Sequence, residues 1–252
     1  RLNIAYHPTD NSMVYFEAAK GFRSGSITSK SIMTASNATL GGTDYDNSSE
    51  PDTLWNYTVG GKWDFGSVSI DVSAFFYDWS DAQVEVSPAL QSIVIPVADI
   101  EGRGIDVTIA WDTPIDGLSL YIAANTNEIE LDNVDEAIIT KNPFMANGSQ
   151  LPGTSKSTYS VIANYARSLD NGMILDVNAV YSARDGIQSV FDGRIAPSVE
   201  LLNASIGIAR DSWKLGLFGR NLTQEEGPSN MVGGQHSIPF PRTLGISFDK
   251  NF

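Results

Sequence analysis

Three arginines stand on the polar side of alternating polar and apolar sequence, each near the end of its alternating run. They are Arg23, Arg184 and Arg220. A guanidinium group is planar, permanently charged and able to donate paired hydrogen bonds, so these residues could hold an anionic ligand such as a carboxylate-bearing chelate. The alternative is ion pairing with another part of the protein or with neighbouring acids such as Glu17 and Asp176, which is the more common role of charges on such a face.

Three other groups of residues could bind a ligand or catalyse a reaction, but each matches its motif poorly. Gly102-Arg103-Gly104 lacks the third glycine and the following helix of a dinucleotide-binding loop. Residues 44–50 carry oxygen ligands at a calcium-like spacing but lack the bending glycine, so a solvated acidic loop is the better interpretation. His7 and His236 are far apart in the sequence, and neither has a nucleophile nearby to form a catalytic pair. The sequence therefore predicts a protein that is not an enzyme and has no resident metal or cofactor.

Composition narrows the class of protein further. The 252 residues include no cysteine and carry a formal net charge of -14, opposite in sign to what phosphate binding requires, so a nucleic-acid partner is excluded. No run of eighteen apolar residues occurs, which excludes a transmembrane helix. The mean hydropathy of -0.12 would suggest a soluble protein. That inference fails for a sheet in which only alternate residues meet lipid.

Alternation with a period of two runs through most of the chain and predicts about eleven antiparallel strands, joined up and down. Short polar turns are expected at residues 7–11, 64–67, 112–117, 168–172 and 210–212. Long polar segments alternate with these turns, chiefly 24–51 and 131–150, and are expected to be loops at the opposite end of the sheet. Short turns at one end and long loops at the other are typical of outer-membrane barrels.

The alternation also predicts which side chains face lipid. Apolar residues expected to point outward include Val72, Val107, Val177 and Ile206, whereas Asp71, Asp176 and Asn178 are expected to point inward. Trp55 and Trp63 share one apolar face, roughly 26 Å apart along an extended strand, so one is expected near each membrane interface. Tyr77 and Trp79 are expected at the outer rim, and the break in parity at Glu101 and Arg103 predicts a bulge or an extramembrane stretch.

The last alternating run carries a family resemblance. Leu244, Ile246 and Phe248 share its apolar face, and Phe252 ends the chain in phase with them, which resembles the closing strand of a bacterial outer-membrane β-barrel. Three further stretches resemble TonB-dependent outer-membrane receptors, in that family's order. They are Gly21-Phe22-Arg23, Gly219-Arg220-Asn221-Leu222-Thr223 and Pro241-Arg242-Thr243-Leu244-Gly245. Lys250 departs from the family pattern, because it lies in phase with Phe248 and Phe252.

The resemblance implies an all-β, up-and-down transmembrane β-barrel of 22 strands, of which residues 1–252 would be the C-terminal half. The plug domain and the first strands would lie upstream. The implied protein is integral to the bacterial outer membrane and takes up a large scarce nutrient with energy supplied by TonB. Iron chelates, cobalamin and oligosaccharides are all carried by this family. The implied partners are the TonB complex through the plug, the barrel-assembly machinery through the strand ending at Phe252, outer-membrane lipid and the transported ligand.

Three other interpretations of the sequence remain open. A passive porin would show the same strands, but with shorter loops and no upstream plug. An outer-membrane hydrolase would need a nucleophile beside a histidine, and the two isolated histidines argue against it. A soluble β-sandwich would also alternate, but the paired tryptophans and the terminal Phe252 argue against it.

Overall fold

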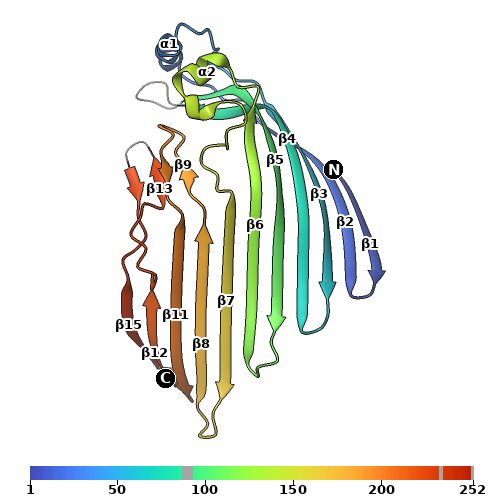
Figure 1. Cartoon of the computed structure of the whole chain (residues 1–252), viewed down its shortest axis with the longest axis vertical. Coiled ribbons are helices and arrows are strands. Elements are labelled where there is room, and N and C mark those ends of the chain that lie inside the picture. The colour runs from blue at the N-terminus through green and yellow to red at the C-terminus, as the bar shows by residue number, and fades with distance from the viewer. Residues whose placement is uncertain (87–92, 233–234, 251–252) are drawn as a thin grey trace.

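A single antiparallel sheet organises the chain in the computed structural model, which describes residues 1–86, 93–232 and 235–250. Eleven strands follow one another around the sheet, each hydrogen-bonded to the next (Figure 1). They are β1 (Leu2–Thr9), β2 (Ser12–Arg23), β3 (Asp52–Asp64), β4 (Val68–Val86), β5 (Ile93–Asp112), β6 (Leu118–Asp132), β7 (Ser157–Ser168), β8 (Ile174–Arg184), β11 (Val199–Arg210), β12 (Trp213–Arg220) and β15 (Thr243–Lys250). The predicted up-and-down strand order is confirmed. In the described part of the chain the sheet is open, with β1 and β15 as its two edges.

The short turns lie together at one end of the sheet and the long connections at the other, as predicted (Figure 1). We call these the turn end and the loop end. One boundary differs from the prediction, because β1 continues to Thr9 and leaves only Asp10 and Asn11 in the first turn. Pro8 fits into this strand because β1 is an edge strand whose pairing shifts register between Tyr6 and Thr9.

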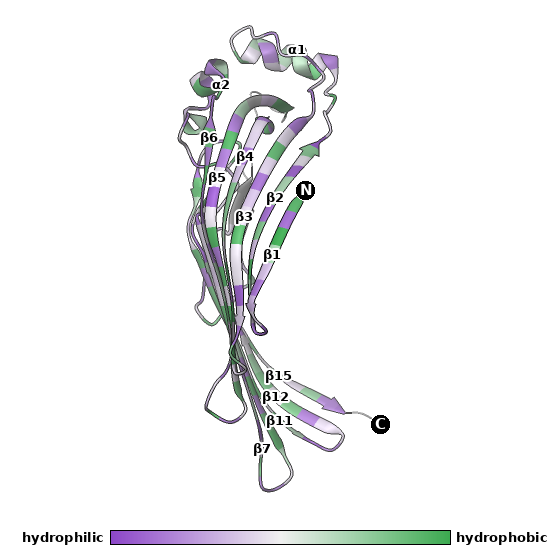
Figure 2. Cartoon of the chain, turned by 90° about the vertical axis from the view of Figure 1, so that its right-hand side faces the viewer, coloured by the Kyte–Doolittle hydropathy of each residue, from purple (hydrophilic) through white to green (hydrophobic). Residues whose placement is uncertain are grey.

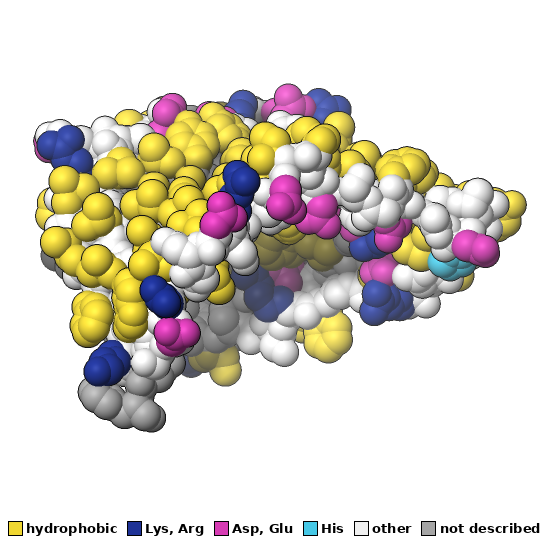
Figure 3. Space-filling model, turned by 90° about the horizontal axis from the view of Figure 1, so that it is seen from below, with side chains coloured by type: hydrophobic (Ala, Val, Ile, Leu, Met, Phe, Trp, Pro, Cys, Tyr) yellow, Lys and Arg dark blue, Asp and Glu magenta, His cyan; other side chains and the backbone are white. Residues whose placement is uncertain are grey.

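The two faces of the sheet differ in chemistry. Directly paired residues share a face, and the apolar pairs include Val72 with Val107 and Val177 with Ile206. The opposite face carries polar pairs. Asp71 binds Lys62 at 2.5 Å, Asp176 binds Lys214 at 2.9 Å, and Asn178 donates to Asn164 at 2.7 Å. Figure 3 shows apolar side chains over the outside of a trough and charged side chains in its hollow, which confirms the predicted facing.

Aromatic side chains lie at both ends of the outer face. Trp55 and Trp63 fall at opposite ends of β3, and Trp111 lies near the turn end of β5. Tyr57 stacks between Trp55 and Phe76, with ring centroids 6.0 and 6.4 Å apart. Such rings are enriched at membrane interfaces because they combine an apolar body with a polar edge.

The long connections contain structure that the sequence patterns did not reveal. Helix α1 (Lys30–Thr39) lies within the expected loop 24–51, and its N-terminus is capped by the Ser29 hydroxyl, which accepts from the Ile32 amide. Helix α2 (Glu136–Lys141) and the 3-10 turn η1 (Pro143–Met145) lie in the next long connection. Two small sheets complete the loop end, formed by β9 (Ile187–Gln188) with β10 (Ile195–Ala196) and by β13 (Asn230–Val232) with β14 (Gln235–Ser237).

The hairpin of β4 and β5 extends much further than expected. The polar sequence between Trp79 and Gly102 is expected to leave the sheet as a loop, but β4 runs to Val86 and β5 begins at Ile93. The pairing is regular at Glu101 and Arg103, where a bulge was one expectation. The irregularity falls instead between Trp79 and Ala82, and Asp81 has a φ of 54° there. A bulge bends its strand, so the distal hairpin leaves the line of the sheet.

Most buried apolar side chains of the described residues lie at the loop end, in a unit that we call the cap. It consists of segment 24–51 with α1, the β4–β5 hairpin beyond Trp79, and segment 131–156 with α2 and η1 (Figure 2). Its buried residues include Met33, Leu40, Val86, Ile93, Ile95, Ile138 and Met145. A single sheet cannot bury a core by itself, so the core forms where α1, α2, η1 and their flanking segments pack against the hairpin.

Candidate functional site

Arg23, the last residue of β2, is held by the base of the cap. Its Nε and Nη2 atoms donate to Asp52 Oδ2 at 3.1 and 2.5 Å, and Nη2 also donates to the Gln83 carbonyl at 2.6 Å. The guanidinium lies over the Trp79 ring, 4.9 Å from its centroid. Only 2% of the Asp52 side chain is exposed, against 48% for Arg23. The charge of Arg23 is therefore matched by a buried carboxylate within the same fold.

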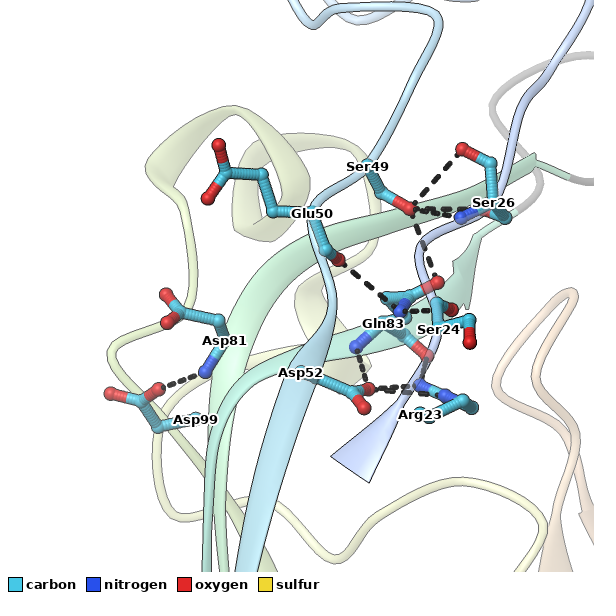
Figure 4. A network of polar contacts seen from close by, with 9 residues as sticks. All are labelled: Arg23, Ser24, Ser26, Ser49, Glu50, Asp52, Asp81, Gln83 and Asp99. Atoms are coloured by element: carbon cyan, nitrogen blue, oxygen red, sulfur yellow. Dashed lines mark hydrogen bonds and ion pairs between the residues drawn. The ribbon is translucent and has the colours of Figure 1, made fainter. Parts of the chain in front are cut away.

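Gln83 connects this ion pair to both ends of segment 24–51 (Figure 4). Its backbone amide donates to Asp52 Oδ2 at 3.1 Å. Its side-chain amide donates to the carbonyls of Ser24 and Glu50 at 3.1 and 3.3 Å, and Ser49 donates to its Oε1 at 3.1 Å. The loop that carries α1 is thereby fastened where it leaves β2 and where it enters β3.

Asp52 lies beyond Trp55 on the loop side, outside the expected apolar belt. Burial acts to raise the pKa of the Asp52 carboxyl, but the Gln83 amide and the Arg23 guanidinium outweigh burial and hold that pKa below its usual value. The carboxylate is therefore the form that the fold stabilises.

Arg184 ends β8 and points into a different environment. Its Nη1 donates to the Asp185 carbonyl at 2.8 Å, and its Nη2 donates to the Ser229 carbonyl. Across residues 1–86, 93–232 and 235–250, no carboxylate forms an ion pair with it. It lines a cavity of about 500 Å³ together with the hydroxyl, amide and carboxylate side chains of Asp106, Asn125, Thr158, Ser160 and Ser182. This cavity combines the Arg184 cation and the Asp106 carboxylate with several neutral hydrogen-bonding groups.

Arg220 ends β12 and lies 5.4 Å from the ring centroid of Phe218. It is exposed and does not line the Arg184 cavity. The three arginines share the concave face and the loop end, as predicted, but they do not form one cluster. β3 to β7 separate Arg23 from Arg184, and β11 separates β8 from β12.

The expected acidic partners were wrong. Glu17 binds Arg1 at 2.7 Å, and Asp176 binds Lys214 at 2.9 Å. Glu17 lies six residues from Arg23 along the same strand, about 20 Å away, so it is out of reach. Cross-strand pairing decides the partner instead, because Arg23 lies opposite Asp52. Asp52 is the first acidic residue of the next strand, β3. Identifying it as the partner of Arg23 requires the pairing register of β2 and β3.

A second cavity, of about 300 Å³, lies at the base of the cap. Its lining includes Arg23, Trp79, Gln83 and Glu85, with apolar walls from Ile100 and Leu151. Sequence reasoning missed this cavity, because the distal part of the β4–β5 hairpin was expected to be a loop. No three His, Asp or Glu side chains gather to hold a metal in the described part of the chain, and the acidic segment 44–50 forms no such group there.

Comparison with known families identifies the sheet. The family model described as TonB dependent receptor-like, beta-barrel, matches residues 1–222. The chain belongs to the TonB-dependent receptor family. No described helix has the length and apolarity to cross a membrane. Comparison with curated proteins gave no match.

Solved structures show the same fold for this receptor chain. The ferric yersiniabactin uptake receptor of Yersinia pestis matches with a TM-score of 0.75 at 18% identity, over 99% of this chain and 36% of that one. The ferric preacinetobactin receptor of Acinetobacter baumannii gives 0.71 at 16% identity, covering 99% and 36% of the two chains. The ferric-catecholate import receptor of E. coli K12 gives 0.67 at 15% identity, covering 99% and 34%. The chain thus spans about a third of the length of these receptors, and its open sheet matches part of their barrels.

Proposed function

We propose that this chain is the C-terminal part of the barrel of an outer-membrane receptor that takes up a large anionic nutrient, foremost an iron chelate, with energy supplied through TonB. Membership of the TonB-dependent receptor family is the observation that carries this proposal. The structures reported above are described as receptors for ferric compounds, which supports the iron-chelate class. The function is binding and transport, with no covalent step.

Partners follow from the same proposal. A plug domain and further strands upstream would complete the receptor, and TonB would act on that plug. The barrel-assembly machinery would recognise the strand that ends at Phe252, a residue outside the described ones. Outer-membrane lipid would cover the apolar face, on which Leu217, Ile246 and Phe248 are 54, 72 and 64% exposed.

Arg184 is the arginine best placed to contact the ligand. Its charge is opposed by no carboxylate partner among the described residues, and it lines a cavity that is open to the concave side. A carboxylate or another anionic oxygen could replace one of its two carbonyl acceptors and gain a charge-assisted hydrogen bond. Arg23 is a weaker candidate because Asp52 already matches its charge, and Arg220 is weaker because it lies outside the cavity.

A passive porin is the second candidate. The cap argues against it, because long loops packed around a buried apolar core occupy the loop end, where a diffusion channel needs short loops and an open mouth. The two functions differ in their energy requirement, which makes them easy to separate.

Iron uptake by cells that express the full-length protein distinguishes an energised receptor from a passive porin. Cells that express it would be given ⁵⁵Fe-labelled ferric citrate, with and without TonB. We expect accumulation only with TonB, and the Arg184→Gln variant should bind the chelate about 10- to 100-fold more weakly, the value of one charge-assisted hydrogen bond. Arg220→Gln is the matched control, from the same face and the same end, and should bind as the wild type does. Equal accumulation without TonB would contradict the receptor proposal and favour a porin.

A further inference from the structure

The outer face of the sheet is hollowed where β12 and β15 reach the loop end. Four large apolar side chains lie directly opposite one another across β8, β11, β12 and β15 and form a row, namely Val177, Ile206, Leu217 and Ile246. In the next outward row towards the loop end, the paired residues Ala204 and Gly219 are small. The step between the two rows forms a groove of about 560 Å³, which we call the outer groove. Its volume is in the range of ligand pockets.

The loop-side wall of the outer groove is Leu222, which the turn at Asn221 folds back onto the outer face. A Cβ atom on Gly219 would overlap the Leu222 side chain, so Leu222 packs directly on the glycine. Asn221 is 4% exposed and has a φ of 49°. Its side-chain amide donates to the carbonyls of Glu225 and Phe240 at 2.8 and 2.9 Å. A buried asparagine therefore holds this wall in place and ties it to the segment that leads into β15.

A cation without a partner lies beyond the loop-side end of the outer groove. Arg242 is exposed and precedes Leu244, a lining residue, by two positions, about 7 Å at the rise of an extended strand. It is in phase with Leu244 in the sequence. Among the described residues, no ion pair or side-chain hydrogen bond involves Arg242. By contrast, Lys20, which also lies on the outer face, is placed over the Trp55 ring, 5.8 Å from its centroid.

An apolar groove with a free cation at one end matches the chemistry of a phosphorylated lipid. The groove is continuous with the apolar outside of the trough, on which Leu217 and Ile246 are 54 and 72% exposed (Figure 3). In the proposed receptor this face meets lipid, and the loop end is the extracellular side, so the neighbouring lipids are those of the outer leaflet. Basic residues at a membrane surface attract anionic head groups.

We propose that the outer groove binds one phosphorylated lipid of the outer leaflet, with an acyl chain over Ala204 and Gly219 and a phosphate group on Arg242. Leu222 and Leu244 would hold the chain from two sides, and the guanidinium would form charge-assisted hydrogen bonds to the phosphate. The site lies on the opposite face of the sheet from the Arg184 cavity. The inference therefore rests on the outer-membrane location in the proposed function, and not on the transported ligand.

Native mass spectrometry of the purified full-length receptor tests this site, because it counts the lipids that stay bound when detergent is removed. The probe is lipid A, and the matched probe is lipid A from which both phosphates have been removed. Ala204→Phe fills the groove, and Arg242→Gln removes the cation. The controls are Ala74→Phe, at a small residue of the outer face outside the groove, and Lys20→Gln. Heat-modifiable gel mobility checks that each variant is folded.

We expect the wild type to bind one lipid A molecule saturably. Ala204→Phe should weaken the binding of both probes at least tenfold, the value of about two displaced methylene groups. Arg242→Gln should weaken lipid A binding about fivefold, the value of one basic residue at an anionic membrane surface, and leave binding of the dephosphorylated probe unchanged. Both control variants should bind like the wild type.

Three results would overturn the site. They are the absence of a saturable lipid A adduct in the wild type, unchanged lipid A binding in Arg242→Gln, and equal weakening in Ala74→Phe and Ala204→Phe. Arg242 lies outside every strand, so Arg242→Gln keeps the test decisive if Ala204→Phe does not fold. A second copy of the chain is the rival occupant. In that case Ala204→Phe would convert a dimer into a monomer without changing lipid A binding, and the lipid site would be refuted.

The outcome is separable from that of the proposed function. TonB-dependent uptake of ferric citrate without saturable lipid A binding refutes only the lipid site. Saturable lipid A binding that responds to Arg242→Gln, without any TonB-dependent uptake, refutes only the receptor proposal.

Discussion

Replacing Asp52 by asparagine should loosen the cap while leaving the strands below it paired. The side chain is 2% exposed, and its Oδ2 accepts from Arg23 and from the Gln83 amide. Asparagine keeps the shape but removes the negative charge, so Arg23 loses its counter-ion and Gln83 keeps at most a neutral acceptor.

The size of the effect follows from the burial of the two partners. Breaking a fully buried ion pair costs about 3–5 kcal/mol, because one charge is left buried without a partner. Here the side chain left behind, Arg23, is 48% exposed and regains water. We therefore expect a loss of about 2–3 kcal/mol in the stability of the cap, near the value of the charge-assisted hydrogen bonds alone. That corresponds to a roughly 30- to 150-fold larger opening constant.

Hydrogen exchange on the full-length receptor measures this opening. Amides of segment 24–51 and of the distal β4–β5 hairpin should exchange faster in Asp52→Asn, while those in the middle of β3 should not change. Glu17→Gln, which breaks the ion pair with the exposed Arg1, is the control and should show no measurable change. Equal exchange in wild type and Asp52→Asn would refute the reasoning, as would a uniform rise across the whole sheet.

The pH dependence of cap opening is a second test of the Asp52 carboxylate. The folded-state pKa of Asp52 is lowered, so its contribution to stability is fully present above the unfolded value, about 3.9, and is lost as the pH falls through the folded value. Opening of the cap in the wild type should therefore increase below about pH 4. In Asp52→Asn this increase should be smaller, because the titrating group is absent.

Three further predictions follow from the faces and the core. Val177→Arg, on the lipid side, should cost about 2–4 kcal/mol of barrel stability in a refolding titration, far more than Asn178→Arg on the concave side, and equal costs would contradict the facing. Ile138→Ala, at a side chain that is 0% exposed, should destabilise the cap by about 2–5 kcal/mol in the same exchange experiment, whereas Ile27→Ala, at 83% exposure, should have little effect. Residues 1–252 refolded alone in detergent should aggregate, because β1 and β15 are unpaired edges, and a monomeric, heat-modifiable band would refute this.

The alternation of the sequence was sufficient to predict the strands and their faces. A period of two is a local property, and each strand must present one face to lipid, so the side of Val177 or Asn178 can be read from its neighbours alone. The turns could also be predicted from local sequence, because residues such as Asn171 and Gly172 favour tight turns in any context. The loop-end position and concave facing of the three arginines rested on the same parity.

The cap and the partners of those arginines were decided by tertiary structure. Helix α1 is short and polar in sequence, and it is stabilised by burying Met33 against a hairpin that was expected to be a loop. Arg23 was expected to pair with acids such as Glu17, but the register placed Asp52 opposite it, and the irregularity after Trp79 brought Gln83 onto the same carboxylate. Tyr77 and Trp79, expected at the outer rim, lie towards the loop end of β4, on the same face as Asp71. A local pattern fixes which way a side chain points, but its partner depends on which strand is adjacent and on where the pairing shifts.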